Sequence, residues 1–218
     1  MINGIQWKVC GLTDAEAAET AAGCGADFLG FILYAKSPRY LALARFAAMA
    51  PGLPDLPKVA VSVEPKPEDL AAMERAGFDF FQVHFRHDLP PAQLEGWSQA
   101  VGAERLWLAP KLPPAVDVPA GWLPLARRFL LDAFRADLYG GTGKTSDWHK
   151  FADHRRKHPE QVWILAGGLN AENLAEALRQ TGAKVLDVNG GVESAPGIKD
   201  PAKIAAFAAA LRAPATGA

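Results

Sequence analysis

Apolar residues occur in short, nearly continuous runs along this chain, and glycines or chemically active side chains follow several of the runs. Such runs are typical of parallel strands that are buried on both faces. In a barrel of parallel strands the carboxyl ends meet at one face, so the residues at these ends are expected to line one pocket. Five segments end in this way: Trp7-Lys8-Val9-Cys10-Gly11, residues 31–39, Leu130-Leu131-Asp132, Ile164-Leu165-Ala166-Gly167-Gly168 and Leu186-Asp187-Val188-Asn189-Gly190-Gly191.

The whole pattern alternates predicted strands with predicted helices. Thr13 or Asp14, Asn170 and Asp200 have side chains that cap helix N-termini, and Asp147-Trp148 marks another helix start. Besides the helix that starts at Asp147-Trp148, helices are expected at residues 15–24, 67–76, 91–100, 170–180 and 200–212. The strands are expected at residues 5–10, 27–33, 58–63, 78–84, 105–109, 128–134, 162–166 and 185–188.

This alternation predicts an α/β fold, a single (β/α)8 TIM barrel that comprises residues 1–218. Residues 111–125 should hold the fifth helix, but they carry four prolines, and proline interrupts helices. The fifth helix is therefore expected to be irregular or missing. With 218 residues, half of them hydrophobic, the chain suits one well-buried domain and is short for two.

Charge and composition restrict the class of partner. Lys and Arg total 23 against 24 Asp and Glu, so no global field attracts nucleic acid or an anionic membrane, and any anion site must be local. No run reaches the roughly 20 apolar residues of a membrane span, and the first six residues lack the features of a signal peptide. The two cysteines, Cys10 and Cys24, are expected to be thiols in a reducing compartment, the cytoplasm.

Cys10 and Asp132 are the candidates for acid–base chemistry. A thiolate at Cys10 would act as a base or nucleophile if a neighbour lowered its pKa; the alternative is a small buried hydrophobic residue. Apolar surroundings would raise the pKa of the Asp132 carboxyl group, which suits a general acid. The alternative for Asp132 is a structural carboxylate bonded to loop amides. Cys24, inside a predicted helix, is assigned to the core.

Two pairs of glycines predict an anion site. Gly167-Gly168 and Gly190-Gly191 follow the seventh and eighth predicted strands, and in barrels of this kind a phosphate commonly lies between those two loops, held by backbone N–H groups. Paired glycines remove the Cβ atoms that would keep the anion away. Tight turns that need a positive φ are the alternative interpretation.

Three further positions are candidates for substrate contact. Arg39 has a planar fork that suits a carboxylate, although a solvated loop arginine is the alternative, and Asp187 is positioned to bond a hydroxyl or an amine. The loop Gly140-Gly141-Thr142-Gly143-Lys144-Thr145 is not a phosphate loop, because Leu138 stands where that motif needs glycine. We interpret it as a flexible cover of the pocket, with Gly141 and Gly143 among the substrate-binding residues.

Together these segments resemble the phosphoribosylanthranilate isomerases, the (β/α)8 barrels of tryptophan biosynthesis, and the resemblance extends from Lys8 to Asp200. It rests on Lys8-Val9-Cys10-Gly11-Leu12-Thr13, Gly25-Ala26-Asp27, Gly30-Phe31, Ser37-Pro38-Arg39-Tyr40, Leu131-Asp132, Gly140-Gly141-Thr142-Gly143-Lys144, Ala166-Gly167-Gly168-Leu169-Asn170, Gly191-Val192-Glu193, Pro196-Gly197 and Lys199-Asp200.

The resemblance implies an Amadori rearrangement of N-(5-phosphoribosyl)anthranilate to an aminodeoxyribulose 5-phosphate. By position, Asp132 matches the general acid that opens the ribose ring, Cys10 matches the base that takes the C2 proton, and Arg39 would hold the anthranilate carboxylate. Such proton transfers need one acid and one base, so no metal and no cofactor is expected. The implied partner is a small-molecule substrate, and members of the family occur as monomers and homodimers.

The chain also departs from the family pattern, at Glu64 after the third predicted strand, at Phe85 after the fourth and at Gly190 after the eighth. These departures leave a second hypothesis, a non-catalytic or substrate-shifted barrel that binds a sugar phosphate. A third hypothesis is another sugar-phosphate isomerase, such as the related aminoaldose isomerase of histidine biosynthesis. Paired aspartates are expected there, and Cys10 argues against it.

Overall fold

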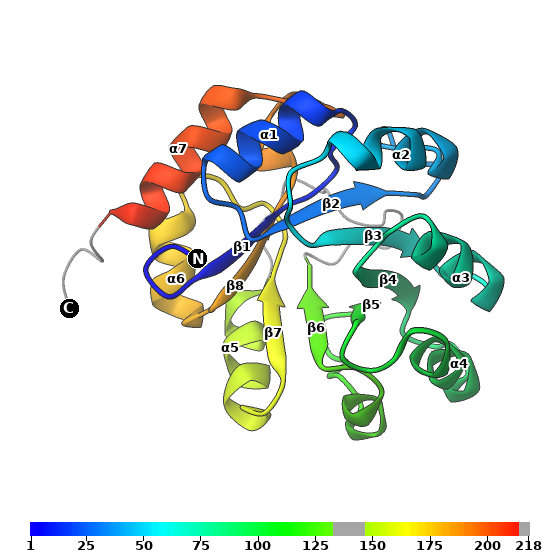
Figure 1. Ribbon diagram of the computed structural model, residues 1–218. Coiled ribbons are helices and arrows are strands. Elements are labelled where there is room, and N and C mark those ends of the chain that lie inside the picture. The colour runs from blue at the N-terminus through cyan, green and yellow to red at the C-terminus, as the bar shows by residue number, and fades with distance from the viewer. Residues whose placement is uncertain (133–146, 214–218) are drawn as a thin grey trace.

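The computed structural model describes residues 1–132 and 147–213 of the chain. Its centre is a closed barrel of parallel strands in which each strand pairs with the next along the chain and the last pairs with the first, which confirms the predicted (β/α)8 fold (Figure 1). The barrel strands are β1 (Gln6–Val9), β2 (Phe28–Ile32), β3 (Lys58–Val63), β4 (Phe80–Arg86), β5 (Leu106–Lys111), β6 (Arg128–Leu131), β7 (Val162–Leu165) and β8 (Val185–Val188).

Alternate residues of each strand face opposite sides of the barrel wall. Along β3, Val59 and Val61 pack inside the barrel, whereas Ala60 belongs to the outer core beneath the helices. Successive side chains of a strand point to opposite faces, so a strand buried on both sides needs apolar residues at nearly every position. This is why continuous apolar runs, rather than alternating ones, predicted the strands.

Helices surround the barrel (Figure 1). Asp14 caps the first helix by accepting a hydrogen bond from the Ala17 N–H, and Asp147 and Asp200 cap two others in the same way, all as predicted. The helices are α1 (Ala15–Gly23), α2 (Leu43–Met49), α3 (Pro67–Arg75), α4 (Pro91–Val101), α5 (Trp148–Lys157), α6 (Leu174–Thr181) and α7 (Pro201–Arg212), with a 3-10 turn η1 (Ala50–Gly52) after α2.

The fifth crossover is irregular, as the prolines predicted. Between β5 and β6 the structure has only a 3-10 helix, η2 (Ala120–Leu125), with Pro124 inside it. Trp122 is buried there and its ring lies 5.3 Å from that of Phe85, so a short turn with one large side chain covers this part of the barrel.

Several predicted boundaries are wrong. Helix α6 begins at Leu174 rather than at Asn170, because the Asn170 side chain accepts hydrogen bonds from the N–H groups of Glu172 and Asn173 and so closes a turn before the helix. Strand β4 runs two residues later than expected at both ends, and α2 was not predicted. Residues 133–134, assigned to the sixth strand, lie outside the described residues.

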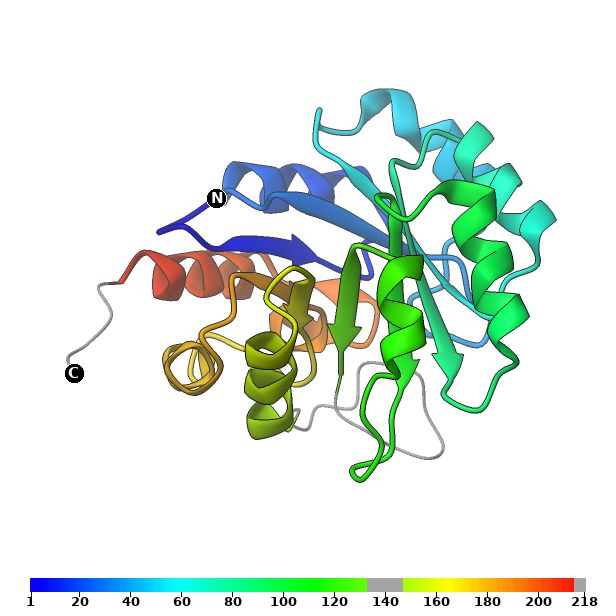
Figure 2. The ribbon, with the colours of Figure 1, turned by 90° about the horizontal axis from the view of Figure 1, so that it is seen from below.

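After β8 the chain forms a short 3-10 turn, η3 (Gly190–Val192), and a small hairpin of β9 (Glu193–Ala195) and β10 (Ile198–Lys199) before α7. The N-terminal segment lies against the C-terminal end of α7 (Figure 2). The Asn3 side chain donates to the Leu211 carbonyl oxygen there at 2.9 Å. In the part of the chain that the structure describes, no helix is both long and apolar enough to cross a bilayer.

Candidate active site

A cavity of about 320 Å³ opens at the carboxyl ends of the barrel strands. Its wall includes all the predicted site residues that the structure describes: Cys10, Arg39, Asp132, Gly167, Gly168, Asp187, Gly190 and Gly191. Gly141 and Gly143, the remaining two, lie outside the described residues. Residues that are far apart in the sequence therefore line one pocket, because the barrel brings the ends of its strands together.

Cys10 follows β1 directly, and its backbone N–H donates to the Val188 carbonyl oxygen at the end of β8. A Cβ atom at the next residue, Gly11, would lie 2.8 Å from both Arg39 Cδ and Asn189 Oδ1, so only glycine fits between Cys10 and these loops. Burial raises the pKa of the Cys10 thiol to about 11, and the Asp187 carboxylate contributes in the same direction. In the protein without substrate, Cys10 is therefore a neutral thiol near pH 7.

Lys8, which was not predicted as a site residue, lies behind the cavity wall and contacts two residues that line it, Gln82 and Asp187. Its side chain is fully buried, and Nζ donates to Gln82 Oε1 at 2.5 Å and to Asp187 Oδ2 at 2.9 Å. Burial lowers the pKa of Lys8, but Asp187 and Cys10 outweigh burial and leave the pKa raised. The result is a buried ammonium ion, and its charge also lowers the pKa of Cys10.

The two carboxylate oxygens of Asp187 differ in their hydrogen bonding. Oδ2 accepts from Lys8, whereas Oδ1 is buried and has no hydrogen-bond partner within residues 1–132 and 147–213. Because a buried carboxylate oxygen without a donor is costly, this atom is suited to accept a hydrogen bond from a hydroxyl group in the cavity.

Gln82 and His84, which were not predicted as site residues, extend the Lys8 network along β4. Lys8 has only donors, so the Gln82 atom facing it must be the oxygen, and the Gln82 amide nitrogen then donates to His84 Nε2 at 2.8 Å. His84 consequently carries its proton on Nδ1. Burial, together with the Lys8 charge, lowers the pKa of His84 to about 3, so the ring is neutral.

Asp132 comes directly after β6 and lines the cavity together with Cys10. Three strand-to-strand steps around the barrel separate the ends of β6 and β1. The site thus presents a carboxyl group and a thiol from separate strands to one enclosed volume, an arrangement in which an acid and a base can act on one molecule.

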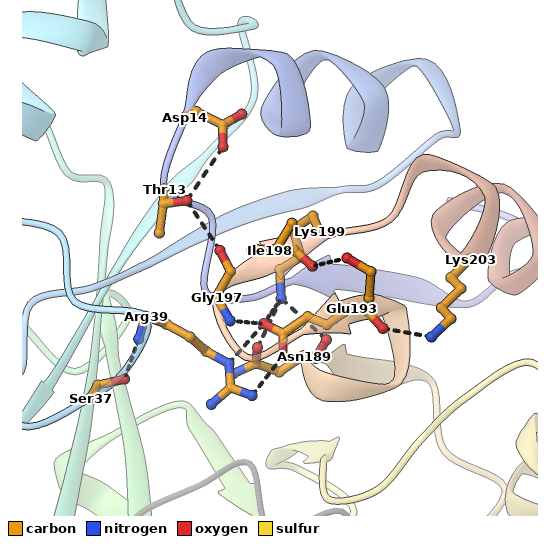
Figure 3. Close-up of polar contacts among 11 residues, drawn as sticks. Thr13, Asp14, Ser37, Arg39, Asn189, Glu193, Gly197, Ile198, Lys199 and Lys203 are labelled. Carbon is orange, nitrogen blue, oxygen red and sulfur yellow. Dashed lines mark hydrogen bonds and ion pairs between the residues drawn. The ribbon is translucent and has the colours of Figure 1, made fainter.

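Arg39 does reach the cavity, but its side chain also binds a buried carboxylate of the protein. Nε and Nη2 of Arg39 donate to the two carboxylate oxygens of Glu193 at 2.8 and 2.6 Å (Figure 3). Lys199 Nζ donates to the same Glu193 carboxylate at 2.9 Å and to the Asn189 side-chain oxygen at 2.9 Å. Glu193 and Lys199 contributed only to the family resemblance, and neither was predicted as a site residue.

The two glycine pairs lie in adjacent loops. Gly167 and Gly168 adopt φ of 90° and 64°, in the left-handed region, and within the described residues their N–H groups donate to no protein acceptor. Gly191 packs so closely on the loop after β7 that a Cβ there would lie 1.9 Å from the Leu169 carbonyl oxygen. This close approach brings the glycines of both loops together at the cavity wall, and backbone N–H groups of such loops can bind an anion.

Of the positions that depart from the family pattern, only Gly190 lines the cavity. Phe85 is fully buried on the outer side of β4, with ring centroids 5.5 Å from Trp97 and 5.3 Å from Trp122. Glu64 has a φ of 44° and accepts hydrogen bonds from the backbone and side chain of Arg86.

Comparison with known proteins gives a consistent family assignment. A family model described as N-(5'phosphoribosyl)anthranilate (PRA) isomerase matches residues 7–210. A Cereibacter sphaeroides protein named N-(5'-phosphoribosyl)anthranilate isomerase is 36% identical over 230 residues, covering 94% of this chain and 97% of the relative.

Solved structures agree with this assignment. The phosphoribosyl anthranilate isomerase of Thermus thermophilus superposes with a TM-score of 0.78 at 32% identity, covering 95% of this chain and 98% of that one. Another phosphoribosyl anthranilate isomerase, in complex with reduced 1-(o-carboxyphenylamino)-1-deoxyribulose 5-phosphate, superposes with a TM-score of 0.74 at 26% identity and covers 95% and 98% of the two chains.

Proposed function

This chain belongs to the N-(5'-phosphoribosyl)anthranilate isomerase family, and from that premise we propose that Cys10 and Asp132 perform the proton transfers of its reaction. The protein is an isomerase of tryptophan biosynthesis that acts on a small molecule. It converts N-(5-phospho-β-D-ribosyl)anthranilate to 1-(2-carboxyphenylamino)-1-deoxy-D-ribulose 5-phosphate.

The reaction begins at the ribose ring. Asp132 protonates the ring oxygen, the bond between C1 and that oxygen breaks, and the nitrogen lone pair forms a Schiff base at C1. The thiolate of Cys10 then takes the proton from C2, and the electron pair of the C–H bond gives an enolamine. Tautomerisation of the enolamine returns a proton to C1 and yields the ketone. The buried Lys8 ammonium favours the thiolate form that this step needs.

Substrate binding is divided among the remaining residues of the cavity wall. The backbone N–H groups of the loops at Gly167-Gly168 and Gly190-Gly191 bind the phosphate, and Arg39 binds the anthranilate carboxylate. The open oxygen of Asp187 accepts a hydrogen bond from a sugar hydroxyl. Gly141 and Gly143 belong to the same binding surface as a proposal from sequence alone. Binding energy from the phosphate would position the reacting carbons between Asp132 and Cys10.

One observation carries this assignment of roles: Cys10, Asp132 and the glycines with open N–H groups line the same cavity. A turnover assay tests it. Phosphoribosylanthranilate is generated in place from anthranilate and phosphoribosyl pyrophosphate, and the loss of its fluorescence is followed above the hydrolysis background.

Cys10→Ser and Asp132→Asn are each expected to lower kcat by at least about 100-fold, the range for a missing general base or acid. Cys24→Ser is the matched control, because Cys24 is a free thiol at the end of α1 and outside the cavity. Unchanged turnover in the Cys10 and Asp132 variants would remove both from the mechanism.

We also propose that residues 1–218 form one catalytic domain that works in the cytoplasm as a monomer or homodimer, without nucleic-acid or membrane partners. A net charge of −1 and two free thiols support the location and the lack of polyanionic partners. Sedimentation velocity on the purified protein decides between the monomer and the homodimer.

A further inference from the structure

The pair of Arg39 and Glu193 joins two loops at the mouth of the barrel. Arg39 lies between β2 and α2, and Glu193 begins β9, which follows β8. Only 9% of Arg39 and 6% of Glu193 are exposed. Glu193 binds the edge of the guanidinium that is formed by Nε and Nη2, and Figure 3 shows this side-on contact.

A guanidinium group has five N–H donors in one plane and can present two edges to carboxylates. Glu193 occupies the first edge of Arg39. The second edge, formed by Nη1 and the other N–H of Nη2, has no acceptor among the residues that the structure describes. Because Arg39 lines the cavity, this edge is the part of the side chain that can bind a second carboxylate in a two-point contact.

Lys199 cannot take that role, because its donors are already used. Its Nζ lies 2.9 Å from Glu193 Oε1, 2.9 Å from Asn189 Oδ1 and 3.2 Å from the Asn189 carbonyl oxygen. An ammonium group has three N–H donors, so these three acceptors satisfy it, and only 2% of the side chain is exposed.

The charges of this cluster do not cancel. Arg39 and Lys199 are positive and Glu193 is negative, so one buried positive charge remains. Burial raises the pKa of Glu193, but hydrogen bonds from Arg39 and Lys199 lower it below its usual value, so Glu193 is ionised. A buried excess charge is unfavourable until a counter-ion binds, and among these groups only the outer edge of Arg39 has donors to offer.

We propose that Glu193 is a positioning residue that holds one edge of the Arg39 guanidinium and so directs the other edge at the aromatic carboxylate of the substrate. This inference rests on the proposed role of Arg39. Its consequence is specificity: Glu193 sets the preference for an N-aryl aminoaldose that carries an ortho carboxylate over one that lacks it.

The test compares two substrates. Phosphoribosylanthranilate carries the carboxylate, and phosphoribosylaniline, formed from aniline and ribose 5-phosphate, lacks it; product is measured by chromatography. Glu193→Gln is expected to lower the kcat/KM ratio of the two substrates by about 10- to 100-fold, the loss of one charge-assisted contact, mainly through KM for phosphoribosylanthranilate. Activity on phosphoribosylaniline should stay within about twofold, since the interaction that is weakened is absent there.

The chain offers a matched control. Arg179 and Glu176 form the same side-on pair on the exposed surface of α6, and Glu176→Gln should change neither substrate's kcat/KM. Glu193→Asp keeps the charge but shortens the side chain, so it should give a preference between those of the native protein and Glu193→Gln. It also serves as the test variant if Glu193→Gln does not fold, as judged by circular dichroism.

The outcomes of these assays distinguish the role proposed for Glu193 from the role proposed for Arg39. If Arg39→Lys abolishes the preference for the carboxylate and neither Glu193 variant lowers it, the role of Glu193 is overturned while that of Arg39 stands. If Glu193→Gln slows both substrates equally, Glu193 serves the fold alone, and the inference is again overturned. If Arg39→Lys leaves the preference intact, the role of Arg39 fails and the inference fails with it.

Discussion

Lys8 and Asp187 lie directly opposite each other in the register of β1 and β8, and Lys8 Nζ is 2.9 Å from Asp187 Oδ2. Both side chains are buried, and 0% of the lysine is exposed. Removing two charges from water costs several kcal/mol per ion in real proteins, and a single ion pair seldom recovers that cost. Stability therefore does not account for this pair, whereas its place at the cavity wall, which Asp187 lines, and its effect on the Cys10 thiol do.

The first prediction concerns the stability of this pair. Lys8→Met should lower the free energy of unfolding by about 3–5 kcal/mol, because it leaves the Asp187 carboxylate buried without its counter-charge. The double variant Lys8→Met with Asp187→Asn should lose less than Lys8→Met alone, since no charge remains buried. Urea unfolding followed by circular dichroism measures both. A single variant that is as stable as the native protein would contradict the prediction.

The second prediction concerns pH. Because the pKa of Cys10 is raised to about 11, its thiolate fraction at pH 7 is about 10⁻⁴ and rises about tenfold per pH unit up to pH 11. The rate of alkylation by iodoacetamide, measured in a Cys24→Ser background, should follow the same rise. Because the pKa of the Cys10 thiol is raised, little thiolate is present at neutral pH, and the alkylation rate should increase with pH over the whole range up to pH 11.

The groups that face Cys10 determine how this titration changes in variants. Burial and Asp187 raise the pKa of the thiol, whereas Lys8 and Lys199 lower it, and the Arg39 charge also interacts with the thiolate. Lys8→Met should therefore move the midpoint of the alkylation profile above that of the native protein. A midpoint that is unchanged or lower would show that Lys8 does not act on the thiol.

Much of the fold could be predicted because it depends on local patterns. The strands Lys58–Val63 and Val185–Val188 were predicted end to end, since each is a nearly continuous apolar run, interrupted only by Ser62 in the first and by Asp187 in the second. Asp14 and Asp200 were predicted as caps because a carboxylate can accept from N–H groups two or three residues ahead. Asn170 offered the same signal but uses it in a turn before α6.

The candidate site could be predicted only as far as strand ends reveal it. Cys10, Asp132 and the glycine pairs were found because they follow strands. Arg39 and Glu193 are 154 positions apart in the chain, and neither residue's neighbourhood in the sequence indicates the other. Lys8 did leave a signal, a charged residue in the middle of an apolar strand, since a lysine there must be buried and paired.

The third prediction concerns His84. Its Nε2 accepts from Gln82, and its pKa is lowered to about 3, so the neutral form with the proton on Nδ1 should persist from pH 5 to pH 8. Long-range proton–nitrogen NMR spectra, assigned by comparison with His84→Ala, should show an unprotonated Nε2 and no shift change over this range. A midpoint between pH 5 and pH 8 would mean that the ring is protonated and that the Gln82 hydrogen bond is broken.

The fourth prediction separates the two glycines of the loop after β8. A Cβ at Gly191 would lie 1.9 Å from the Leu169 carbonyl oxygen and 2.9 Å from its carbonyl carbon. Both are backbone atoms, so Gly191→Ala must push apart the loops that follow β7 and β8. A Cβ at Gly190 would meet only Arg39 Nη2 at 3.6 Å and Glu193 Oε2 at 3.9 Å, which are ordinary contacts.

Gly191→Ala should therefore lower the free energy of unfolding by about 1–3 kcal/mol, the range for overpacking, and weaken binding of inorganic phosphate as measured by calorimetry. Gly190→Ala, the control in the same loop, should change the free energy of unfolding by no more than about 0.5 kcal/mol, as substitutions without a steric conflict do. If Gly191→Ala binds phosphate as tightly as the native protein does, the anion does not depend on the close approach of these two loops, and the phosphate site must be sought elsewhere in the cavity.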